Sequence, residues 1–178
     1  MQQGFLRFAG FVAILLCLSF SEIFGQITYF SRNSGSAWNL ASSWSTVAFD
    51  NPTNTGTFPV AGDFVFIGGT GSNISISAAA SCATLDIAVG STLNINEGLS
   101  VSGTTLVNGN LSIGSTAGAK TFGGQVTLNG IWFEVVNEAL TFQGGLSNNG
   151  VFIASNGLHT FGAAQTISGT LLIPRVRV

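Results

Sequence analysis

The stretch from Thr121 to Phe152, TFGGQVTLNGIWFEVVNEALTFQGGLSNNGVF, contains one pattern twice, with Phe122 and Phe142 each eight residues before the glycine of an Asn-Gly pair. The same spacing recurs on both sides of this stretch, at intervals of 21, 20 and 19 residues. The apolar members are Val101, Phe122, Phe142 and Phe161, and their marker glycines are Gly109, Gly130, Gly150 and Gly169. A period near 20 residues is too short for a helix pair and suits one turn of a stacked β-coil.

At four further positions, residues of a similar kind recur at a fixed distance from the marker glycines. We expect the residues just before the glycines to form a ladder of side-chain amides about 4.8 Å apart, and the glycines to turn corners with positive φ. The phenylalanines should stack inside the coil. The positions are Asn108, Asn129, Asn149 and Ser168 (one before), Val107, Leu128, Asn148 and Ile167 (two before), Gly103, Gly124, Gly144 and Ala163 (six before), and Leu111, Trp132, Phe152 and Leu171 (two after).

Segments that precede the clear repeats alternate apolar and polar residues with period two, which is typical of half-buried strands. These segments are 64–67, 73–77, 83–87, 92–96 and 99–101. Gly90 lies 19 residues before Gly109 and indicates an earlier, degenerate turn. The sequence therefore predicts an all-β fold, a right-handed parallel β-helix (β-solenoid) of about five coils over residues 64–178.

Residues 26–63 break the repeat and are interpreted as an N-terminal cap, because the first coil of a solenoid would otherwise expose an apolar end and a strand edge. Trp38 and Trp44 could plug that end. Alternatively, exposed indoles could stack on sugar rings. Trp38, Trp44 and Trp132 are accordingly the candidate ligand-binding residues.

The two ends of the chain suggest export and continuation. Arg7 is the only charge before an apolar run from Phe8 to Leu18, about half the roughly 20 residues of a membrane span. We expect residues 1–25 to be a secretory signal peptide cleaved after Gly25, with no permanent membrane span. Residues 171–178 read as a further strand without a polar cap, so we expect truncation and end-to-end continuation of the solenoid; alternatively, Pro174 and the two arginines after it protect the edge.

Charged residues make up only 7% of the chain, and the formal net charge is −2. The absence of a basic patch argues against nucleic-acid binding. Abundant Ser, Thr, Asn and Gly predict a neutral, hydroxyl-rich surface. Cys82 falls in the column of Val101 and is expected to be a buried apolar filler.

The sequence offers little support for catalysis. Glu134 and Glu138 are the closest pair of carboxylates, but a strand would hold them roughly 13 Å apart, and a solvated edge is the simpler interpretation. His159 occupies a position that holds Lys120 and Leu140 in earlier repeats, which indicates a tolerant column. We predict no catalytic residues, no metal site and no cofactor, although a polysaccharide lyase or hydrolase on this kind of scaffold stays open.

Several phrases resemble a known family. They are Trp38-Asn-Leu-Ala-Ser-Ser-Trp44, Phe58-Pro-Val-Ala-Gly-Asp-Phe-Val-Phe-Ile67, Leu85-Asp-Ile87, Gly90-Ser-Thr-Leu93 and Gln165-Thr-Ile-Ser-Gly-Thr-Leu171. The chain resembles secreted, repeat-rich surface proteins of Bacteroidota, many exported by the type IX route, and is similar to the glycine-rich β domain of some cell-surface proteins. The resemblance implies an extracellular parallel β-helix used in adhesion, matrix or surface display. The printed sequence departs from that family at its C-terminal end, where a sorting domain is usual, so we expect a truncated chain and the resemblance leaves its export route open.

The leading functional prediction is a non-catalytic extracellular or cell-surface structural or adhesive protein, with glycans or other cell-surface components as partners. The alternative is a carbohydrate-binding or accessory module of a polysaccharide-degrading enzyme. An ice- or mineral-binding protein is a third hypothesis, because Thr121, Thr141 and Thr160 share one column. A single column beside phenylalanine makes a narrow face for that purpose.

Overall fold

The computed structural model describes residues 25–53, 56–162 and 164–178. The predicted signal peptide therefore lies outside the described residues except for Gly25, as does Ala163 of the small column. Strands dominate the described residues, with one short 3-10 helix, η1 (Ala41–Ser43). The all-β prediction is confirmed.

The strands form three sheets, which we call A, B and C. Sheet A contains β1 (Thr28–Ser31), β2 (Trp44–Ser45), β3 (Phe64–Ile67), β6 (Thr84–Ile87), β9 (Thr105–Val107), β12 (Val126–Leu128), β15 (Leu146–Asn148) and β18 (Ile167–Gly169). Sheet B contains β4 (Asn73–Ile76), β7 (Thr92–Ile95), β10 (Asn110–Ile113), β13 (Ile131–Glu134) and β16 (Val151–Ile153). Sheet C contains β5 (Ala80–Cys82), β8 (Leu99–Val101), β11 (Lys120–Phe122), β14 (Leu140–Phe142), β17 (His159–Phe161) and β19 (Val176–Arg177).

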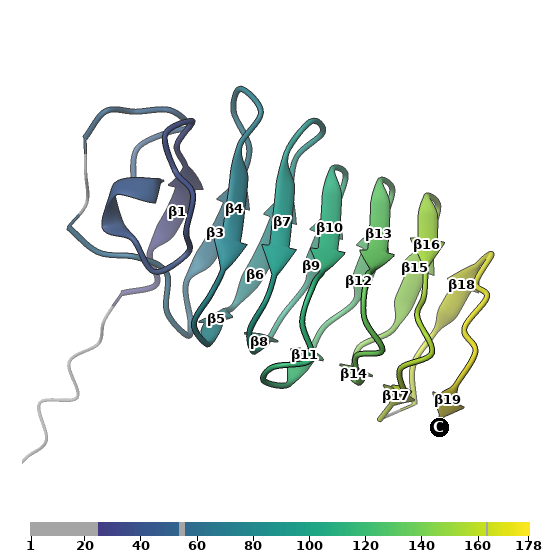
Figure 1. The fold of residues 1–178 in the computed structure, drawn as a ribbon. Coiled ribbons are helices and arrows are strands. Elements are labelled where there is room, and N and C mark those ends of the chain that lie inside the picture. Colours follow the sequence, from purple (N-terminus) through teal and green to yellow (C-terminus); the bar gives the residue numbers. More distant parts are fainter. Residues whose placement is uncertain (1–24, 54–55, 163) are drawn as a thin grey trace, which may run out of the picture.

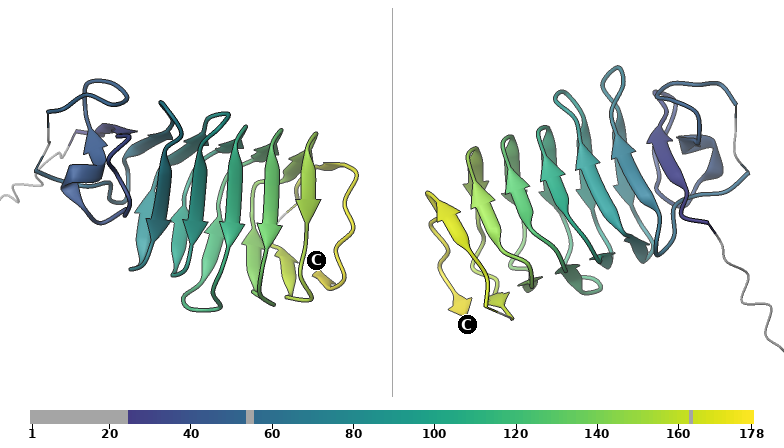
Figure 2. Two further views of the ribbon diagram at one scale, coloured as in Figure 1. Left: turned by 45° about the horizontal axis from the view of Figure 1, so that its top comes forward. Right: turned by 180° about the vertical axis from the view of Figure 1, so that it is seen from behind.

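The chain visits the three sheets in turn, so each coil contributes one strand to each sheet (Figure 1). Consecutive coils pair in parallel, as the predicted β-solenoid requires. The solenoid has about six turns, one more than predicted. Five are complete, beginning with β3, β4 and β5, and a sixth contributes only β18 and β19. Both views in Figure 2 show the coils side by side, with the cap at one end and the C-terminus at the other.

The predicted aromatic stack lies inside the coil. Phe122, Phe142 and Phe161 occupy one register column of sheet C and are at most 3% exposed. The centroids of neighbouring rings are 5.5 and 5.3 Å apart, and each pair is 17° from parallel. Earlier coils place Val101 and Cys82 in the same column, both 1–2% exposed. The repeat therefore defines a continuous apolar core.

The asparagine ladder is also confirmed. The Asn129 side-chain amide donates to Asn108 Oδ1 at 2.8 Å, and the Asn149 amide donates to Asn129 Oδ1 at 3.0 Å. Exposed side chains thus tie three consecutive coils together along the axis. Such bonds add to the backbone ladder and help to fix the register of the coils.

The prediction of positive φ at the Asn-Gly corners is wrong for Gly109, Gly130 and Gly150, which are not among the residues with positive φ. Glycine is required there by close approach of successive coils. A Cβ at Gly130 would overlap the carbonyl oxygen of Gly109, and one at Gly150 would overlap the carbonyl oxygen of Gly130. Only a residue without a side chain lets the corners stack.

The last repeat departs from the predicted columns. Phe161 and Ile167 are separated by two more residues than Phe142 and Leu146, and Ile167 pairs with Leu146. Gly169 consequently lies beside Asn148 and not in the column of Gly150. A longer corner therefore shifts the register of β18, which the spacing of marker glycines did not reveal.

The described residues of the segment 26–63 lie at the N-terminal end of the solenoid. Its strand β1 extends sheet A by pairing in parallel with β3, and β2 pairs with β1 antiparallel. Asp63 accepts hydrogen bonds from the backbone amides of Ile27 and Val60, at 3.1 and 2.9 Å. The cap thereby covers the edge of β3, the strand that the first coil contributes to sheet A.

Candidate functional site

The three candidate indoles are core residues. The exposed fractions of Trp38, Trp44 and Trp132 are 2%, 0% and 0%. Stacking on a sugar requires an open ring face. The prediction that these tryptophans bind a ligand is therefore wrong for this structure, and the packing interpretation of the cap indoles is confirmed.

Trp38 and Trp44 form the plug of the first coil. Their rings meet edge to face, with centroids 5.4 Å apart. The Trp38 indole N–H donates to the carbonyl oxygen of Pro59 at 3.1 Å, and the Trp44 indole N–H donates to that of Trp38 at 2.7 Å. Both polar atoms are satisfied inside the cap, which explains why two indoles can be buried there.

Trp132 fills the fourth coil. Its ring contacts Phe122, Phe142 and Phe152, with centroid distances of 5.1, 5.8 and 5.5 Å. Its indole N–H donates to Glu134 Oε1 at 3.1 Å. Trp132 therefore links the aromatic core to a buried carboxylate.

The interpretation of Glu134 and Glu138 as a solvated edge is wrong. β13 ends at Glu134 and a turn follows, so the extended separation does not apply. Glu134 is 5% exposed and Glu138 is 4% exposed. Each carboxylate contacts a buried base: Glu134 Oε1 lies 2.9 Å from His159 Nε2, and Glu138 Oε1 lies 3.4 Å from Lys120 Nζ.

The pair of Glu134 and His159 is closed within the protein. His159 Nδ1 lies 3.1 Å from the carbonyl oxygen of Gly157, which can only accept, so Nδ1 donates. The other oxygen of Glu134 accepts from the Ser155 amide and hydroxyl at 2.8 and 2.9 Å. Since neither side chain is exposed, the pair cannot reach a substrate in this structure.

Lys120 acts as an internal cation. Its ammonium donates to the carbonyl oxygens of Ser115, Ala117 and Gly118 at 2.8, 2.7 and 3.1 Å. Burial raises the pKa of Glu138, and the Lys120 ammonium opposes that shift. The pair thus organises the turn between β10 and β11 and is a structural element.

Sequence reasoning missed these buried bases, although a signal was present. Lys120 and His159 each lie two residues before a core phenylalanine, so strand alternation turns them to the same inner face. Their acidic partners depend on the turn geometry and could not be paired by spacing.

Cys82 and Asp86 are two further titratable side chains whose pKa values are raised by burial. Burial raises the pKa of the Cys82 thiol to about 12, which leaves it a thiol at neutral pH and agrees with its expected role as filler. Asp86 lies on the outer face of sheet A between Phe66 and Leu106, and partial burial raises its pKa.

Among the described residues, no group of three or more His, Cys, Asp and Glu side chains could hold a metal ion. Over the same part of the chain, no helix has the length and apolar character needed to cross a bilayer.

The outer face of sheet B is the broadest regular surface, because strands of four residues turn two side chains outward. In the first three coils those side chains are polar. We call them the amide half: Asn73, Ser75, Thr92, Asn94, Asn110 and Ser112. The Asn94 amide donates to Asn73 Oδ1 at 2.7 Å, so part of this half is already hydrogen-bonded along the axis.

In the next two coils the same columns become apolar. We call this region the apolar patch. It contains Ile131 (43% exposed), Phe133 (42%), Val135 (59%), Val151 (51%) and Ile153 (45%). Ile131 pairs with Val151 and Phe133 with Ile153, so the patch is continuous across neighbouring strands. The prediction of a hydroxyl-rich surface is therefore wrong for this part of the molecule.

The hydroxyl column of sheet C is real but narrow. Thr121, Thr141 and Thr160 align in register and continue Ser81 and Ser100 of earlier coils. Strands of three residues whose ends point inward expose only their middle side chain. The face is therefore one residue wide, as expected.

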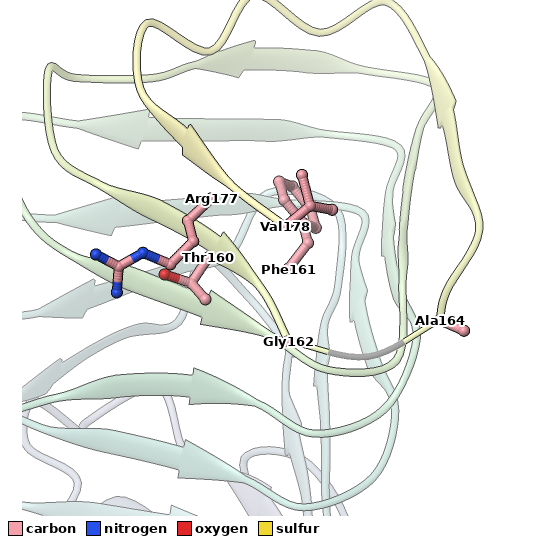
Figure 3. A pocket seen from close by; sticks show the side chains of 6 residues that line it. All are labelled: Thr160, Phe161, Gly162, Ala164, Arg177 and Val178. Atoms are coloured by element: carbon pink, nitrogen blue, oxygen red, sulfur yellow. The ribbon is translucent and has the colours of Figure 1, made fainter.

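A hollow of about 500 Å³ lies at the C-terminal end of the coil, between β17 and β19. Figure 3 shows Phe161 and Val178 close together inside it, with Thr160 and Arg177 on one side and Ala164 pointing away. Its lining includes the ring of Phe161, which is 3% exposed, and one guanidinium, that of Arg177, with no second ionisable side chain. Its shape follows from the incomplete sixth coil.

Comparison of the chain with protein-family profiles, with curated proteins and with solved structures found no match. The functional argument consequently rests on the residues and geometry described above.

Proposed function

We propose that this chain is a non-catalytic extracellular or cell-surface β-solenoid with a structural or adhesive role. In this role the stacked coils form a rigid spacer, and the outer face of sheet B is the contact surface. The observation that carries the proposal is the apolar patch on an otherwise neutral sheet face. Contiguous exposed apolar patches of a few hundred Å² are often functional surfaces in proteins.

The interior supports the spacer role. Parallel strands link every coil to the next, stacked rings and the asparagine ladder reinforce the third to fifth coils, and two indoles pack inside the N-terminal end. In a solenoid each repeat contacts only its neighbours, so the strength of each junction between coils determines how well the body keeps its shape. Such a body suits the presentation of a surface at a distance from its attachment.

The placement of ionisable groups supports a non-catalytic role. Glu134, Glu138, Lys120 and His159 would be the natural acids and bases of a hydrolase or lyase. Each is at most 5% exposed and is paired with another member of the group. Their arrangement serves to neutralise buried charge.

The expected location rests on the sequence of residues 1–25 and on the resemblance to secreted surface proteins. To test it, cells that produce the full chain would be labelled with an antibody against residues 26–178. We expect labelling of intact cells and its loss after mild external proteolysis. Labelling only after lysis would contradict the proposal.

A separate assay addresses catalysis. The purified protein would be incubated with pectin, alginate, xylan and chitin, and reducing ends and unsaturated sugars would be measured. We expect no release above a boiled control. Release that depends on Glu134 or His159 would contradict the non-catalytic role.

The amide half favours one second candidate, a carbohydrate-binding module. Its exposed amides and hydroxyls are the groups that recognise sugars by hydrogen bonding. Retention on insoluble polysaccharide that is lost in Asn94→Ala, and kept in Thr141→Ala on sheet C, would support this candidate. Equal retention of both variants would count against it.

A further inference from the structure

We infer that the apolar patch is a contact between two copies of this chain, which pack face to face through sheet B. This inference rests on the proposed function and deepens it, since it names the partner of the proposed contact surface. Four properties of the patch carry it: its chemistry, the register of its strands, its lack of charge and its area.

The chemistry of the patch fits another apolar sheet better than a polar ligand. Four of its five side chains are β-branched aliphatics, which offer neither hydrogen-bond donors nor acceptors. Phe133 alone presents an aromatic ring. These aliphatic side chains offer a glycan neither a hydrogen-bond partner nor an aromatic face for ring stacking. An apolar partner requires neither.

The geometry of the patch is self-complementary. Ile131, Phe133, Val151 and Ile153 lie on adjacent parallel strands in direct register, so they form two straight columns. Two sheets pack about 10 Å apart through side chains of this kind. A two-fold axis lying between the two faces would set the apolar patch of each copy on that of its partner, which is the common form of homodimer contact.

Charge does not oppose this contact. The outward columns of sheet B carry no charged side chain along the described strands, and the carboxylate of Glu134 points inward. The formal net charge of −2 per chain is small. Two copies can therefore approach through this face without bringing like charges together.

The area determines how strong the contact is. The exposed fractions of the five side chains correspond to on the order of 450 Å² of apolar surface per copy, within the range of the largest patches on monomers. A standard interface buries about 800 Å² per partner, so the patch supplies roughly half and the amide half would form the polar rim. We therefore expect a weak dimer in dilute solution. Many copies on one surface would strengthen it through avidity.

Sedimentation equilibrium of residues 26–178, which contain every described strand, tests the inference over a range of about 1 to 500 μM. We expect a reversible monomer–dimer equilibrium with a dissociation constant in the micromolar range. Phe133→Glu should weaken it on the order of 100-fold, because the dimer would bury an unpaired charge. The matched control is Thr141→Glu, which places the same charge on sheet C of the same coil and should leave dimerisation unchanged.

Val151→Thr combined with Ile153→Thr provides a second variant that keeps β-branched side chains and preserves strand propensity. It should weaken the dimer without altering the far-ultraviolet circular dichroism spectrum. A wild-type chain that stays monomeric at 500 μM, or a dimer that persists in both patch variants, would overturn the inference. Either result would leave the surface labelling of intact cells unchanged. Failure of the dimer is therefore distinguishable from failure of the proposed function.

Discussion

Removal of the middle ring of the aromatic stack should destabilise the protein strongly. Phe142 is fully buried between Phe122 and Phe161, with Trp132 at its side. In Phe142→Ala the lost transfer free energy is roughly 2 to 3 kcal/mol. The cavity adds roughly 2 kcal/mol if neighbouring coils cannot collapse into it, for a total of about 4 to 5 kcal/mol. Collapse is restricted because parallel hydrogen bonds hold the strands on both sides.

The assay is equilibrium unfolding in urea, followed by circular dichroism at neutral pH. The matched control is Phe133→Ala, which removes the same ring from the outer face of the same coil, where the side chain is 42% exposed. We expect the control to lose about 1 kcal/mol or less. Protein concentration should be low enough to keep both variants monomeric. A loss below about 1 kcal/mol for Phe142→Ala, or equal losses for the two variants, would refute the reasoning.

Three further predictions concern the corners and the buried ion pair. Gly130→Ala should destabilise the fold by at least about 2 kcal/mol, because its methyl group would overlap the Gly109 carbonyl. The control Gly162→Ala should be nearly neutral, because a Cβ there has nothing within 4 Å. Thermal unfolding of the two variants would compare these effects. Lys120→Met should cost about 3 to 5 kcal/mol by leaving the Glu138 carboxylate buried without its partner, and adding Glu138→Gln should recover part of this loss in a double-mutant cycle. The pKa of Glu138 in the folded protein lies above its ordinary value of 4.5. Its contribution to stability is therefore complete below pH 4.5 and declines as the pH rises through the folded pKa. Urea titrations at several pH values should show this decline in the wild type and its absence in Glu138→Gln.

The fold was largely predictable because every repeat is subject to the same packing requirement. Each coil must place an apolar side chain at the same point of the interior, so Phe122, Phe142 and Phe161 had to share a column once the period was recognised. The asparagine ladder follows from the same alignment. The sixth coil was harder to predict, because its longer corner shifts Ile167 by two positions in the register.

The candidate site was less predictable for two physical reasons. Around Trp132, the sequence Ile-Trp-Phe is apolar on both faces of the strand, so alternation alone cannot say which side chains face water. The register with Leu111 decides it and turns Phe133 outward. Lys120 reads as a surface residue by composition, and only its carbonyl partners and Glu138 explain how its charge can be buried.

The central claim is that successive coils stack in strict register, and a distance between spin labels tests it most directly. Ser81 and Thr160 face outward in one column of sheet C, four strand steps apart. In residues 26–178, cysteines at these two positions could be labelled selectively, because the only other cysteine of that segment, Cys82, is buried and its raised pKa keeps it unreactive. Double electron–electron resonance should give one narrow distribution near 20 Å, since four steps of about 4.8 Å separate the backbones. A broad distribution, or one centred beyond about 30 Å, would contradict the stacked arrangement.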